Sequence, residues 1–173
     1  VAETEVGLEL KMFKSRVNLD VAVYRKITTD QIVPVQISTA SGFTNTSINS
    51  GKSSNKGFEV LLDIIPVETK AFTGDFTANT SYNITRVLSI LTNTPGERIT
   101  IGTHPFNGEV RDVVGLEMGQ IAGFGYARDA KGQRMFLSDG ITLRTTDLIL
   151  FGSALPKWPG GFWYSFSYTV INL

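Results

Sequence analysis

The chain has 173 residues, which is long enough for one domain with a sizeable core. Its 16 basic and 16 acidic side chains cancel, so it lacks the positive field with which a nucleic-acid surface neutralises phosphates. Charged residues make up 18%, against roughly 25% in typical soluble domains, while 42% are hydrophobic. Cysteine is absent, which excludes disulfides and thiolate metal sites.

No apolar run approaches the ~20 residues that a membrane helix requires. No signal peptide is visible and the sequence starts at Val1, so we expect an internal fragment or a processed chain. Membrane residence would then require a closed β-barrel, whose sequence signature is a series of alternating segments of ~10 residues.

Residues 4–13 and 16–26 alternate between apolar and polar side chains, which is the period of a β-strand. The very short connection at Lys14 and Ser15 predicts an antiparallel hairpin. The aliphatic face holds Val6, Leu8, Leu10, Met12, Val17, Leu19, Val21 and Val23, and the other includes Glu5, Glu9, Lys11, Asn18 and Asp20. Two environments fit this pattern: a sheet with one face on a core and one in water, or a barrel wall between lipid and a polar lumen.

Residues 27–56 form a polar stretch in which Pro34 argues against a central strand. Alternation returns over 57–66 and 72–82, joined by a short turn. Short and long connections between the strands therefore alternate along the chain. An outer-membrane barrel shows this asymmetry, with tight turns on one side and large loops on the other.

Residues 83–157 are expected to form a second long loop. Within it, residues 115–126 predict a glycine-spaced strand or bulged hairpin, residues 127–134 a hairpin turn with Lys131 and Gly132 at its tip, and residues 138–140 another turn.

The final segment, residues 158–173, alternates with the period of a strand, and its apolar face is unusually aromatic. One face carries Phe162, Tyr164, Phe166, Tyr168 and Val170, and the other carries Trp163, Ser165, Ser167 and Thr169, with Ile171 departing from the pattern. Large rings in a row suit either a sandwich core or the outside of a membrane barrel near its interfaces.

Few residues offer chemistry. His104, the single histidine, lies in a predicted loop without a nucleophile motif, so we interpret it as a solvated side chain. Glu117, Asp129 and Asp139 are carboxylates of the kind that bind calcium, but their spacing matches no calcium loop and favours turn formation. We predict no catalytic, cofactor or metal site and no enzymatic activity, and no substrate-binding residue is distinctive. Glu5, Glu9, Lys11, Asn18 and Asp20 either line an aqueous lumen or form the wet face of a sheet.

Several blocks, in a fixed order, carry a family resemblance that covers nearly the whole chain. They lie at residues 6–13, 16–24, 28–35, 40–43, 49–52, 55–60, 115–126, 128–133 and 151–162. Together these blocks resemble the C-terminal barrel region of SusC/RagA-type TonB-dependent outer-membrane transporters. One block departs from that pattern: Gly152-Ser-Ala-Leu-Pro156 stands where the family usually has Gly-Asn-Pro-x-Pro.

The resemblance implies an all-β antiparallel meander within a transmembrane barrel of about 22 strands that encloses a plug domain. It further implies the bacterial outer membrane as location, TonB-driven import of glycans or peptides, a SusD-like surface lipoprotein over long extracellular loops, contact with membrane lipid, and no cofactor. Strands are expected roughly at 4–13, 16–26, 57–66, 72–82 and 158–173, with long loops at 27–56 and 83–157 and no plug domain. The contrasting hypothesis is a soluble all-β binding or adhesin-like module, with the apolar faces paired in a sandwich core.

Overall fold

The structure is a computed structural model that describes residues 1–92 and 94–168. The chain divides into two compact units. The first comprises Val1–Thr28, Ser54–Thr85 and Pro156–Leu173, and the second comprises Thr29–Ser53 and Arg86–Leu155. No helix among the described residues is long and apolar enough to cross a membrane.

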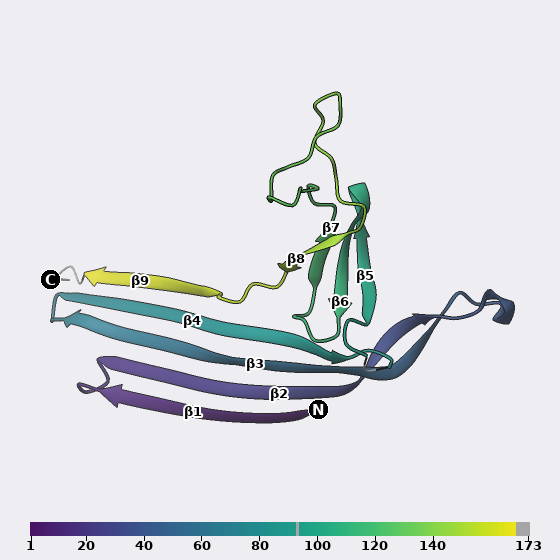
Figure 1. The fold of residues 1–173 in the computed structure, drawn as a ribbon. Coiled ribbons are helices and arrows are strands. Elements are labelled where there is room, and N and C mark those ends of the chain that lie inside the picture. Colours follow the sequence, from purple (N-terminus) through teal and green to yellow (C-terminus); the bar gives the residue numbers. More distant parts are fainter. Residues whose placement is uncertain (93, 169–173) are drawn as a thin grey trace. The chain divides into compact units, whose positions relative to one another are not determined.

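The first unit is built on a five-stranded sheet in the order β1-β2-β3-β4-β9 (Figure 1). The strands are β1 (Ala2–Met12), β2 (Val17–Gln36), β3 (Asn45–Glu68), β4 (Phe72–Ser89) and β9 (Gly160–Tyr168). Residues 29–36 of β2, 45–53 of β3 and 86–89 of β4 belong to the second unit. β1 and β2 pair antiparallel without interruption from Ala2↔Ile27 to Met12↔Val17. β9 pairs antiparallel with β4, from Phe72↔Tyr168 to Thr80↔Gly160, although the two strands are far apart in the sequence.

Two tight turns join these strands at one end of the sheet. Phe13, Lys14 and Ser15 all adopt left-handed backbone angles, and the Arg16 amide donates to the Phe13 carbonyl at 3.3 Å. Between β3 and β4, the Thr69 amide donates to the Phe72 carbonyl at 2.8 Å. Both predicted short turns are confirmed.

The second unit contains a four-stranded sheet in the order β5-β6-β7-β8. Its strands are β5 (Arg98–His104), β6 (Gly108–Val113), β7 (Gln120–Gly123) and β8 (Ile149–Ser153), and two 3-10 turns, η1 (Thr39–Ser41) and η2 (Pro105–Asn107), accompany them. A small core forms where Val87, Ile90 and Val114 are buried, with Val33, Ile99 and Met118 packed against them. Because the other segments of this unit are short and rich in turns, this cluster is its main hydrophobic core.

Residues 124–148 form an arm of short, bridged segments between β7 and β8. Isolated bridges join Tyr126 to Arg144, Arg128 to Arg134 and Phe136 to Thr142. The predicted turns at 127–134 and 138–140 are confirmed, since Gly132 and Gly140 have φ of 79° and 84° and their amides close the two turns.

The predicted long loops are too long, and the strands beside them too short. β2 continues through Pro34 to Gln36, β3 begins at Asn45, and β4 runs to Ser89 instead of ending near residue 82. Four further strands lie between residues 98 and 153. The reason is that backbone pairing needs no apolar side chains, so alternation of apolar residues marks only part of each strand. Residues 169–173 of the predicted final strand, with Thr169, Val170 and Ile171, lie outside the described residues.

Candidate functional site

The candidate site is the sheet of the first unit, because its two faces differ sharply in chemistry. Asn18 Nδ2 donates to Asp63 Oδ2 at 3.1 Å, and Thr77 Oγ1 donates to Asp63 Oδ1 at 3.0 Å. These bonds place the polar positions of β2, β3 and β4 on one face, here called the polar face. The opposite positions form the apolar face: Val6, Leu8, Leu10, Met12, Val17, Leu19, Val21, Val23, Phe58, Val60, Leu62, Ile64, Phe72, Phe76, Ala78, Tyr82, Phe162, Tyr164, Phe166 and Tyr168.

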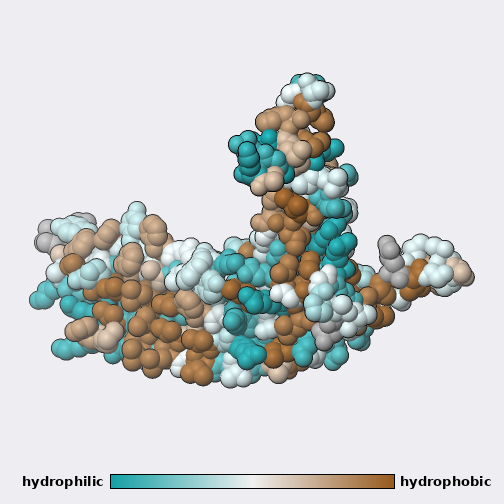
Figure 2. Space-filling model, viewed as in Figure 1, coloured by the Kyte–Doolittle hydropathy of each residue, from teal (hydrophilic) through white to brown (hydrophobic). Residues whose placement is uncertain are grey.

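Much of the apolar face is open. Val6 is 70% exposed, Leu8 58%, Phe162 73% and Tyr168 72%. Figure 2 shows hydrophobic residues gathered over the part of the molecule formed by β1 to β4. A sandwich would bury these side chains against a second sheet, whereas a barrel wall presents them to lipid.

Aromatic rings mark both ends of the apolar face. At one end, the rings of Tyr82 and Trp158 lie 4.6 Å apart and Phe58 packs within 5.9 Å of both. At the other end, beside the tight turns, Phe72 and Phe166 stack with centroids 5.9 Å apart and Tyr164 lies 5.7 Å from Phe166. Aromatic girdles of this kind lie at the two interfaces of a membrane barrel.

The spacing of the two aromatic rows matches a membrane. Phe72 and Tyr82 lie ten residues apart on β4. At ~3.3 Å per residue they are separated by about 33 Å along the strand. A strand tilted by about 40° then spans about 25 Å along the membrane normal, which is the height of the apolar band in outer-membrane barrels.

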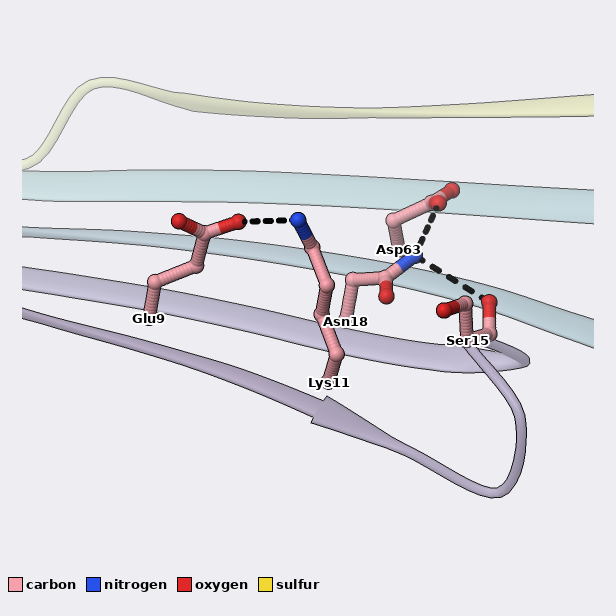
Figure 3. A network of polar contacts seen from close by, with 5 residues as sticks. All are labelled: Glu9, Lys11, Ser15, Asn18 and Asp63. Atoms are coloured by element: carbon pink, nitrogen blue, oxygen red, sulfur yellow. Dashed lines mark hydrogen bonds and ion pairs between the residues drawn. The ribbon is translucent and has the colours of Figure 1, made fainter.

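The polar face carries an excess of negative charge. Its described charged side chains are Glu3, Glu5, Glu9, Asp20, Glu59, Asp63 and Asp75, with Lys11 and Lys26 as the cations, for a net charge of −5. Lys26 and Glu3 are paired at 3.3 Å, and Lys11 and Glu9 at 2.8 Å (Figure 3). Because such exposed ion pairs contribute little to the free energy of folding, we interpret these charges as giving the polar face its acidic character and not as stabilising the fold.

An open concavity of about 700 Å³ lies on this sheet. Its lining includes Glu5, Asp20 and Glu59 from three adjacent strands, with Asn79 and Ser81 from β4. Two of the residues predicted to line a lumen, Glu5 and Asp20, therefore meet in one hollow, and Glu59, Asn79 and Ser81 join them without having been predicted.

The other predicted lumen residues, Glu9, Lys11 and Asn18, lie on the same face nearer the tight turn. Figure 3 shows Glu9 paired with Lys11, while the amide of Asn18 reaches Asp63 and also the Ser15 carbonyl, at 3.3 Å. Asn18 thus ties the tight turn to β3, which the sequence alone does not show.

A hydrogen-bonded cluster crosses three strands of the polar face. Asn83 Nδ2 donates to Tyr24 Oη at 2.9 Å, and Asn55 Nδ2 donates to Asn83 Oδ1 at 2.8 Å and to Thr85 Oγ1 at 2.7 Å. Gly57 makes room for it, since a Cβ there would overlap the Tyr82 carbonyl and lie 2.7 Å from Tyr24 Oη. Such polar clusters fix the register of the strands.

The remaining predicted candidates are dispersed over the second unit. His104 ends β5, and its side chain does not cap the following turn. Asp129 accepts from the amides of Lys131 and Gln133, and Asp139 from that of Ile141, so both stabilise turns as expected. Glu117 pairs through its backbone with Arg86. Within residues 1–92 and 94–168, no group of His, Asp and Glu is placed to hold a metal ion.

Two carboxylates that the sequence does not single out organise the second unit. Glu109 accepts from Arg111 Nε at 2.6 Å and from Thr100, and these bonds lower its pKa. Burial raises the pKa of Asp112, opposed in part by a 2.8 Å hydrogen bond from the Gly119 amide. Both depend on the pairing of β5 to β7, which leaves no signal in the local sequence.

A two-faced antiparallel sheet, exposed and apolar on one side, polar on the other and bounded by two aromatic rows, defines a piece of an outer-membrane barrel wall. The comparison with protein families agrees: the model of the TonB dependent receptor-like β-barrel matches residues 3–171. The chain belongs to this family, which is one of receptors and not of enzymes, and it is part of an outer-membrane protein.

Curated relatives come from Formosa agariphila. TonB-dependent receptor P39 is 36% identical over 89 residues, which is 51% of this chain and 9% of the relative. TonB-dependent receptor P26 is 29% identical over 97% of this chain and 19% of its own length. The chain therefore spans about a fifth or less of the relatives it matches.

Solved structures of RagAB share the fold. A structure of the RagAB peptide transporter has a TM-score of 0.71 at 20% identity, over 96% of this chain and 19% of its own. The RagAB peptide importer in the open-open state has a TM-score of 0.70 at 21% identity, with the same coverage. The predicted family resemblance, fold class and location are confirmed, and the soluble sandwich alternative is excluded.

Proposed function

We propose that residues 1–173 form one stretch of wall and outward loops in a TonB-linked importer of oligosaccharides or peptides. The observation that carries this proposal is the two-faced sheet, whose apolar face has the height of a membrane and whose polar face is hollowed and acidic. The family match supports import, and the RagAB structures are described as those of a peptide importer.

We further propose that the long connections face the outside and meet a SusD-like lipoprotein lid, while the TonB complex contacts other parts of the protein. The tight turns all lie at one end of β1 to β4, which supports this orientation, because outer-membrane barrels place short turns on the periplasmic side. The plug domain would likewise come from other parts of the protein.

Uptake by cells tests the proposal. Fluorescent oligosaccharides and peptides are supplied to cells that carry the full-length receptor, and to strains that lack the receptor, TonB or the proposed SusD-like lipoprotein. We expect one class of cargo to enter only when all three are present. Uptake of both classes that is unaffected by loss of the receptor or of TonB would contradict the proposal.

The acidic polar face supplies a sharper version of the test. Glu5→Gln with Asp20→Asn and Glu59→Gln removes three negative charges from the hollow without changing the size of the side chains. If solutes pass along this face, the triple variant will take up anionic cargo faster relative to cationic cargo than the parent does. Glu68→Gln is the control, since Glu68 lies at an apolar-face position of the same sheet.

A further inference from the structure

The apolar face carries an unexplained pair of cations, Arg25 and Lys56. Arg25 of β2 pairs with Thr4 of β1. It occupies the apolar-face position that follows Val23 along β2. The contacts between β2 and β3 fix their register: the Ile65 amide donates to the Arg16 carbonyl at 2.7 Å, and Gly57 faces Tyr24. Continuing this register brings Lys56 directly opposite Arg25.

This pair lies one row beyond an aromatic row. Phe58 of β3 stacks on Tyr82 of β4 and belongs to this aromatic row. The next apolar-face position along β3, away from the tight turns, is Lys56. Thr4, Arg25 and Lys56 thus form a row of potential hydrogen-bond donors along three adjacent strands, here called the donor row. It lies at the end of the sheet away from the tight turns. The corresponding position on β4 is Ile84, an apolar side chain, so the donor row ends at β3.

Nothing in the described chain neutralises the donor row. Arg25 and Lys56 are both exposed, and neither makes an ion pair with a described residue. Among apolar-face positions of β1 to β4 in the first unit, the one carboxylate is Glu68, at the opposite end, where Arg16 pairs with it at 3.2 Å. Like charges directly opposite each other destabilise a sheet unless an anion lies between them.

We propose that the donor row binds the phosphate of a lipid headgroup in the outer leaflet of the membrane. The aromatic row places these side chains at headgroup level, just outside the apolar band. A guanidinium donates two parallel hydrogen bonds to a phosphate, an ammonium adds a point charge, and the Thr4 hydroxyl offers a further donor. A phosphate there removes the repulsion between the two cations and ties the lipid to the wall.

Lipid binding to the full-length receptor tests this assignment. The purified receptor is titrated in detergent with bisphosphorylated lipid A, with the same lipid after removal of its phosphates, and with inorganic phosphate, and bound lipid is counted by native mass spectrometry. At about 1 kcal/mol for each cation, Arg25→Gln is expected to weaken binding of lipid A about fivefold and the Arg25→Gln/Lys56→Gln pair about thirtyfold. Arg25→Lys should retain most of the binding.

Lys26→Gln is the matched control, because Lys26 follows Arg25 in the chain but lies on the polar face, paired with Glu3. It should bind lipid A like the parent. Heat-dependent mobility on a gel establishes that each variant is folded. Unchanged binding by the double variant, equal binding of the dephosphorylated lipid, or binding of inorganic phosphate as tight as that of lipid A would each overturn the proposal.

Discussion

Leu61 and Leu62 are neighbours on β3 whose side chains point to opposite faces, so they test which face meets lipid. Leu62 lies on the apolar face, and Leu61 lies on the polar face at the edge of the acidic hollow. Replacing each in turn by lysine introduces the same charge, at the same height and in the same strand. Differences in local sequence and in backbone pairing therefore cancel between the two variants.

The structure sets the size of the expected effect. In the register of β3 and β4, in which Phe58 faces Tyr82, Leu62 lies opposite Ala78. Ala78 lies between the aromatic rows at Phe72 and Tyr82, near the middle of the apolar band. A lysine facing lipid at the midplane costs about 2–4 kcal/mol. Leu62→Lys should therefore lower the ratio of folded to unfolded receptor about 30- to 900-fold, whereas Leu61→Lys should change it by less than about fivefold.

The assay is refolding of the full-length receptor into lipid vesicles over a range of guanidinium concentrations, with the folded fraction read from heat-dependent gel mobility. The midpoint for Leu62→Lys should fall well below that of the parent, and the midpoint for Leu61→Lys should stay close to it. If Leu61→Lys destabilises the receptor as much as Leu62→Lys, or more, the assignment of the two faces is wrong.

Three further substitutions test the polar clusters. Gly57→Ala should prevent correct assembly, seen as loss of the heat-modifiable band, because its Cβ overlaps a backbone carbonyl; Gly7→Ala is the control, with its nearest neighbour 3.8 Å away. Asn83→Ala should cost about 1–3 kcal/mol in the same refolding assay, because it removes the hydrogen bonds that Asn83 makes with part-buried Tyr24 and Asn55, and exposed Asn79→Ala on the same strand should cost little. Because burial raises the pKa of Asp112 in the folded state, its carboxyl contributes stability to the second unit that is fully present below the ordinary aspartate pKa and is lost as the pH rises through the raised pKa. Asp112→Asn should remove this contribution and leave the opposite pH dependence that the lowered pKa of Glu109 produces, measured by hydrogen exchange over residues 108–123.

The sequence predicts the wall better than the loops, for a physical reason. Strands facing lipid on one side and water on the other must alternate, so the hairpin of β1 and β2 and the aromatic face of β9 are visible in the residues alone. Leu61 interrupts the alternation of apolar and polar residues along β3, and only the structure shows that β3 still keeps one register with its neighbouring strands.

Contacts between distant segments are not visible in the sequence. The pairing of Phe72 with Tyr168 and the cluster of Tyr24, Asn55 and Asn83 depend on strand order and register, which no local pattern encodes. The C-terminal end of β2 was missed because Pro34 lies within it, and the beginning of β3 was missed because residues 45–56 are almost all polar. The strands β5, β6 and β8 were missed because they are short and their pairing is interrupted by bulges, whereas β7 lies within residues 115–126, for which a glycine-spaced strand or bulged hairpin was predicted.

The two edges of the sheet explain why these tests require the full-length receptor. In the described part of the chain, β1 and β9 each pair with one neighbour in the five-stranded sheet, so each leaves one edge of backbone N–H and C=O groups unpaired. Within lipid each such group costs several kcal/mol, which is why membrane barrels close. Five strands are too few to do so, since the smallest barrels have about eight. Neighbouring strands must therefore cover both edges, in agreement with a chain that corresponds to 19% of a RagAB structure. The stability of this part of the wall then depends on closure of the whole barrel. A substitution that faces lipid therefore changes the free energy with which the full-length receptor folds into the membrane.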